Sequence, residues 1–77
     1  MSVMIEIYYP KPVNTQREGS ISAHVARHGG RVTFREEDSQ DTICLTAEFD
    51  SWEAARTASN SLQAAGEHFE GPAEYGV

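Results

Sequence analysis

The order of hydrophobic periods along the chain predicts an α+β fold, a two-layer sandwich in which two helices cover one face of a four-stranded antiparallel sheet. Three segments alternate apolar and polar residues as half-buried strands do, and a fourth does so less regularly near the C-terminus. Two longer segments repeat their apolar residues with the period of a helix, and each ends at glycine. The order strand, helix, strand, strand, helix, strand takes up almost all 77 residues, so we expect a single domain over 1–77.

The first strand is expected over residues 3–9, where apolar side chains alternate with Met4, Glu6 and Tyr8. The apolar residues of this strand are Val3, Ile5, Ile7 and Tyr9. Pro10 and Pro12 then end it, because proline supplies no ladder donor and keeps the preceding residue extended.

The first helix is expected to begin at Thr15, which together with Glu18 fits a capping box. One stripe along this helix contains Ile21, His24, Val25 and His28. Gly29 and Gly30 are expected to terminate this helix, because the left-handed conformation at a helix C-terminus favours glycine.

Residues 31–36 and 42–49 are expected to form a hairpin around the polar turn 37–41. Regular alternation puts Val32 and Phe34 on the inner face of the second strand. It puts Arg31, Thr33 and Arg35 on the outer face. On the third strand the inner residues are Ile43, Leu45, Ala47 and Phe49, and the outer ones are Thr42, Cys44, Thr46 and Glu48.

The second helix is expected to begin with Asp50 and Glu53 as a second capping box and to end at Gly66. Its apolar stripe contains Trp52, Ala55, Ala58 or Ser59, Leu62 and Ala65. The last strand, 67–75, is interrupted by Gly71-Pro72, which predicts an edge position where the missing proline N–H is tolerated. Right-handed crossovers then give the strand order 4-1-3-2, which is the ferredoxin-like βαββαβ arrangement.

Two glycine positions resemble those of the ACT-type regulatory domains. The matching residues are Gly19-Ser20-Ile21 in the first helix and Gly29-Gly30 before the second strand. The resemblance covers most of the chain and implies a ferredoxin-like fold with a regulatory role exerted through a bound small ligand. It assigns no ligand-binding residue in this chain.

Composition excludes several function classes. With a net charge of −6 and only six basic residues, the chain is a poor partner for nucleic acid, whose binding requires neutralised phosphates. The one cysteine permits no internal disulfide, and no run of residues is apolar enough to cross a membrane. These features, with no signal-peptide pattern at the N-terminus, predict a reduced, cytoplasmic location. The small core that 77 residues can form makes a homodimer a natural supplement to stability.

The first candidate site is the outer sheet face, which no helix covers in this fold. We expect it to carry a ligand or interface site made of Glu6, Tyr8, Arg35, Cys44, Thr46 and Glu48. Cross-strand pairs such as Arg35 with Glu48 would suit an interface, whereas the alternative is a solvated face with no partner.

The second candidate is a metal site. His24 and His28 lie one helical turn apart, a spacing that lets two imidazoles reach one ion, and His68 begins the last strand. Such a site needs further ligands, for which Glu67 or Glu70 are available. The alternative is a pair of partly exposed histidines favoured by the dipole at the end of their helix.

No catalytic constellation emerges from the remaining residues. Glu6 and Glu48 would work as an acid–base pair only in a dry site, and no histidine is expected near Cys44 on its face of the sheet. The sequence therefore predicts a small non-enzymatic binding or regulatory domain with no cofactor, which acts through a protein partner, a second copy or a small ligand at the open face. The alternative is a small metal-binding protein or enzyme using the three histidines.

Overall fold

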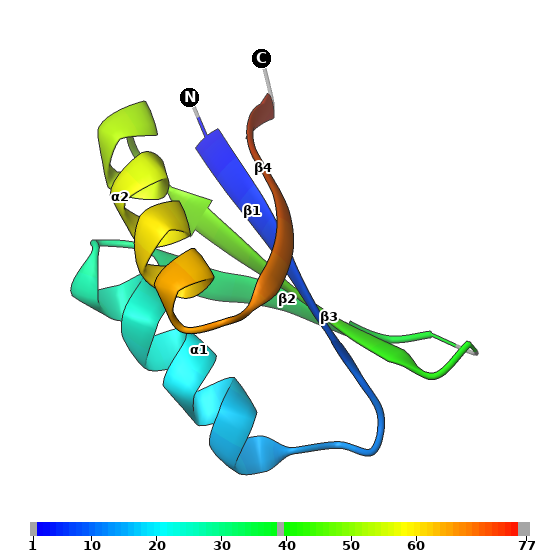
Figure 1. Ribbon diagram of the computed structural model, residues 1–77. Helices are drawn as coiled ribbons and strands as arrows, with labels where there is room; N and C mark the ends of the chain where they lie inside the picture. The colour runs from blue at the N-terminus through cyan, green and yellow to red at the C-terminus, as the bar shows by residue number, and fades with distance from the viewer. Residues whose placement is uncertain (1, 39, 76–77) are drawn as a thin grey trace.

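The structure, a computed structural model, describes residues 2–38 and 40–75 (Figure 1). Its elements are β1 (Ser2–Pro10), α1 (Thr15–Arg27), β2 (Arg31–Glu37), β3 (Thr42–Phe49), α2 (Trp52–Ala64) and β4 (His68–Tyr75). All strand pairs are antiparallel and the sheet order is β2-β3-β1-β4, which is the predicted order read from the other edge. This βαββαβ topology is consistent with a ferredoxin-like fold. None of the helices in 2–38 and 40–75 is long and apolar enough to cross a membrane.

The core lies between the sheet and the two helices, which cover the same face (Figure 1). Burial alternates strictly along β1 and β3, so every second side chain of these central strands points into the core. The cluster at its centre consists of Val3, Ile5, Ile7, Ile21, Val25, Leu45, Ala47, Phe49, Ala55, Ala58 and Leu62. No described element covers the opposite face of the sheet.

In both helices the capping residue lies one position away from the one that the sequence suggested. Asn14 caps α1 by accepting a hydrogen bond from the backbone N–H of Arg17, and Ser51 caps α2 by accepting one from Ala54. The predicted capping boxes that began at Thr15 and Asp50 are therefore wrong. Adjacent residues with capping side chains offer alternatives that local sequence does not separate.

The β2 strand contains an irregularity that reverses the predicted direction of two side chains. Its register with β3 shifts between Val32 and Phe34, so Phe34 stands opposite Thr46 and Arg35 stands opposite Leu45. Because directly paired residues point to the same face, Phe34 lies on the open face and Arg35 on the helical side. The predicted inner position of Phe34 and outer position of Arg35 are both wrong, because one extra residue in a strand moves every later side chain to the other face.

The edge strand β4 carries the second irregularity of the sheet. Its register with β1 shifts between Met4 and Glu6, where Gly71 and Pro72 interrupt β4 as the sequence indicated. Gly71 has a φ of 104°, a conformation that residues with a side chain rarely adopt. The strand nevertheless continues to Tyr75 at the edge of the sheet, as predicted.

Candidate functional site: the open sheet face

The open face, a name used here for the sheet surface opposite the helices, is organised in rows of directly paired residues. One row runs Glu70, Glu6, Thr46, Phe34 from β4 to β2. The next row runs His68, Tyr8, Cys44, Glu36. The side chains of the open face on the two central strands are half-buried by their neighbours, whereas Phe34 is 59% exposed. Polar, aromatic and sulfur-containing side chains thus form a continuous surface across four strands.

Five of the six residues proposed from the sequence lie together on this face. Glu6 pairs with Thr46 and Tyr8 with Cys44, while Glu48 stands opposite Met4 in the neighbouring row. Arg35 is not among them, because the β2 irregularity turns it toward the helices. Its expected pairing with Glu48 is also wrong, since Arg31 occupies the position opposite Glu48.

Sequence reasoning missed Phe34, a large hydrophobic side chain that is exposed on the open face. The only available signal was the alternation of β2, which assigned Phe34 to the core. A bulge has no reliable sequence signature in a strand without glycine, so this residue could be placed only by the register of β2 against β3.

The carboxylates of the open face differ in their partners. Hydrogen bonds from Thr33 and Ser2 lower the pKa of Glu48, and the Arg31 charge contributes. Glu6 stands directly opposite Glu70, and like charges in that position repel. Within the described residues neither Glu6 nor Glu70 forms a salt bridge. The half of the face nearest β4 is therefore acidic without a neutralising partner.

This acidity affects the two titratable groups in the middle of the face. Burial and the neighbouring Glu6 and Glu70 carboxylates raise the pKa of Tyr8 to about 12. Burial, with Glu6 and Glu36, also raises the pKa of the Cys44 thiol. Both groups keep their protons at neutral pH, so Cys44 is a poor nucleophile.

We expect Cys44 to react with iodoacetamide several-fold more slowly than an unstructured cysteine peptide at pH 8, because the thiolate is the reacting form. Glu6→Gln should speed the reaction by removing a nearby negative charge, while Glu53→Gln, an exposed carboxylate on α2, should leave it unchanged. The measurement is the alkylation rate of each folded protein as a function of pH. A Cys44 rate equal to that of the peptide would contradict the expected protonation.

A pocket of about 140 Å³ opens beside the acidic pair on the β1 and β4 strands. It is lined by Met4, Glu6, Glu70, Gly71 and Ala73. A larger hollow of about 520 Å³ is lined only by the continuous stretch 9–17. That hollow is the concave side of the loop between β1 and α1, whereas the smaller pocket is formed by two paired strands and belongs to the open face.

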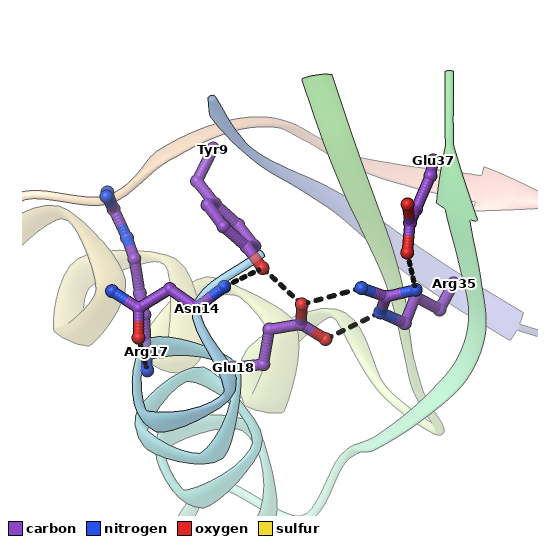
Figure 2. A network of polar contacts seen from close by, with 6 residues as sticks. All are labelled: Tyr9, Asn14, Arg17, Glu18, Arg35 and Glu37. Carbon is purple, nitrogen blue, oxygen red and sulfur yellow. Dashed lines mark hydrogen bonds and ion pairs between the residues drawn. The ribbon is translucent and has the colours of Figure 1, made fainter. Parts of the chain in front are cut away.

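The helical side holds a separate polar network around Tyr9 (Figure 2). The Tyr9 hydroxyl donates to Glu18 and accepts from the backbone N–H of Asn14 at 3.0 Å. Arg35 donates to Glu18 through Nε at 2.7 Å and Nη2 at 3.0 Å, and to Glu37 through Nη1 at 2.7 Å. The network joins the end of β1, the first turns of α1 and strand β2.

Arg17 extends this network toward β4. Its guanidinium lies 5.4 Å from the centre of the Tyr9 ring and donates to Glu67 at 2.9 Å. Hydrogen bonds from Arg35 hold the pKa of Glu18 below its usual range, and burial raises the pKa of Tyr9. In the described part of the chain no buried side-chain polar atom lacks a partner, so the hydrogen-bonding groups buried in this network are satisfied within the protein.

The three histidines do not converge. His24 lies between the helices, with its Nδ1 2.8 Å from the Ser61 hydroxyl, and His28 ends α1. His68 stands opposite Tyr8 and therefore lies on the other face of the sheet. Across residues 2–38 and 40–75, no three His, Cys, Asp or Glu side chains gather closely enough to hold a metal ion.

The chain was compared with known proteins. No family model, curated protein or solved structure matches it. The resemblance to ACT-type domains therefore has no family match behind it, and the open face must be interpreted from its own residues.

Proposed function

We propose that this protein is a small non-enzymatic binding domain that associates with a protein partner through the open face. The observation that carries the proposal is the position of Phe34. A register shift in β2 turns this aromatic side chain out of the core and leaves it 59% exposed beside half-buried neighbours. Bulges are frequently used to redirect a side chain at a functional site.

The composition of the face supports protein association over catalysis. Met4 and Tyr8 lie on the same surface as Phe34, and aromatic residues and methionine are enriched at protein interfaces. Cys44, whose thiol is intrinsically the strongest nucleophile among the residue types of this face, is kept protonated because burial raises its pKa. No observation favours a metal-dependent function, because the sheet lies between His68 and the other two histidines.

Phe34→Asp tests the proposal, with Val13→Asp as its matched control. Val13 is the other large exposed hydrophobic residue described, at 47%, but it lies in the loop between β1 and α1. We expect Phe34→Asp to weaken recovery of the partner from cell extract, or self-association of the protein, by about tenfold, as loss of a central aromatic contact does. Val13→Asp should leave both unchanged.

The measurements are quantitative affinity capture with each variant and sedimentation equilibrium of the purified proteins. A monomer at high concentration that also captures no partner dependent on Phe34 contradicts the proposal. Self-association lost only in Phe34→Asp would identify the partner as a second copy of the chain.

A further inference from the structure

We infer that the partner at the open face is a protein segment that presents a basic side chain and an apolar side chain on the same side. This inference rests on the proposed function and specifies the chemistry of the occupant. One row of the open face, Glu70, Glu6, Thr46 and Phe34, has an acidic end and an aromatic end on one line across the sheet.

The acidic end is formed by Glu6 and Glu70. They face each other in adjacent strands, line the 140 Å³ pocket together and form no salt bridge within the described residues. Their mutual repulsion costs stability in the free protein, and a cation between them would relieve it. Because a water molecule occupies about 30 Å³ in the liquid, the pocket has room for a lysine ammonium or an arginine guanidinium.

The aromatic end is Phe34, two strands away from Glu6 along the same row. Strands lie about 4.8 Å apart, so the carboxylate and the ring are separated by about 10 Å. An extended partner has side chains about 7 Å apart on one side, and the length of a lysine or arginine covers the remainder. One short segment can therefore fill the pocket and contact Phe34 at the same time.

Charge argues against a second copy of this chain as the occupant. The described open face carries four carboxylates, on Glu6, Glu36, Glu48 and Glu70, against one guanidinium on Arg31. Two such faces placed together would oppose carboxylates to carboxylates, which costs affinity, whereas a basic segment is complementary. Burial is the main cause that raises the pKa of Tyr8, and the Glu6 and Glu70 carboxylates at this end of the face raise it further.

The probe is a synthetic peptide that repeats Lys-Thr-Leu-Thr, which puts lysine and leucine on one side of an extended chain. A second peptide has glutamate in place of each lysine. We expect the basic peptide to shift the amide NMR signals of Glu6, Glu70 and Phe34, and the acidic peptide to leave them unchanged. The binding should weaken as salt is raised, since part of it is electrostatic.

Two double variants distinguish the effect of the Glu6 and Glu70 carboxylates from the effect of the protein's net charge. The double variant Glu6→Gln with Glu70→Gln should weaken binding of the basic peptide about tenfold. Glu53→Gln with Glu74→Gln makes the same change in net charge at exposed positions, on α2 and opposite inward-facing Val3, and should have little effect. The first variant should fold at least as well as the original protein, because it removes a like-charge pair.

Equal weakening by both double variants, equal binding of the acidic peptide, or no binding of the basic peptide would overturn the inference. The proposed function fails by a different result, a protein that neither captures a partner nor self-associates through Phe34. If partner capture or self-association depends on Phe34 but not on Glu6 and Glu70, the proposed function stands and the occupant of the open face is not basic.

Discussion

Gly71→Ala is expected to lower the free energy of unfolding by about 3 kcal/mol. For a chain of this size, each kcal/mol lost lowers Tm by roughly 4–8 °C. Two effects combine at this position. A φ of 104° strains any residue with a side chain, and an added Cβ would lie 2.8 Å from the backbone oxygen of Met4. Because Met4 belongs to the central strand β1, that oxygen cannot move away without disturbing the sheet.

Two other glycines separate these effects. Gly66 has a φ of 83° but open space around it, so Gly66→Ala should show the strain alone, about 1–2 kcal/mol. Gly30 shows no such strain, but a Cβ there would lie 2.6 Å from Cδ2 and 2.7 Å from Cζ of the buried Phe49 ring. Gly30→Ala should therefore show crowding alone, about 1–3 kcal/mol.

Urea unfolding of the three variants checks the prediction. Hydrogen exchange should show in addition that Gly71→Ala exposes the amides of β4 before those of β3. If Gly71→Ala costs no more than Gly66→Ala, the close approach of β4 to Met4 is not a constraint on this fold.

Glu18→Gln is expected to cost about 2 kcal/mol at neutral pH, because the bidentate ion pair with Arg35 joins α1 to β2 and Glu18 is mostly buried. Glu37→Gln is the matched control. It removes a more exposed carboxylate from the same guanidinium and should cost less than about 0.5 kcal/mol.

The pH dependence has a defined sign. The folded pKa of Glu18 lies below its usual value of 4.5, so the unfolded chain binds the proton first as the pH falls. The stabilisation is complete above pH 4.5 and is lost as the pH drops through the folded pKa. The free energy of unfolding of the original protein should therefore fall more steeply with decreasing pH below 4.5 than that of Glu18→Gln. If the two proteins lose stability equally with decreasing pH, Glu18 does not contribute through its charge.

The alternating burial of β1 and β3 was predictable because both strands are central and keep an unbroken register over their whole length. The glycine terminators were equally readable, since Gly29 and Gly66 each adopt the positive φ that follows a helix. The capping residues at the helix starts were less predictable from the sequence. Asn14 and Thr15, or Asp50 and Ser51, are adjacent residues that can each cap.

The Tyr9 network shows why part of the helical side was not predictable. A tyrosine on the inner face of a strand requires a partner for its hydroxyl, and that requirement can be read from the sequence. The partner itself cannot, because Glu18 and Arg35 meet only when α1 and β2 pack side by side. Local reasoning assigned Glu18 to a capping box and Arg35 to the opposite face of the sheet.

By itself, the sequence determined the order of the six elements, the antiparallel sheet with its strand order, and the inner faces of the central strands. Periodicity carries this information because each residue of an unbroken element repeats the orientation of its predecessors. Only the tertiary structure decided that Phe34 faces the open side and Arg35 the helices, since pairing with β3 sets the register of β2. A single unpaired residue exchanges the two faces of a strand, and the candidate interface depends on that exchange.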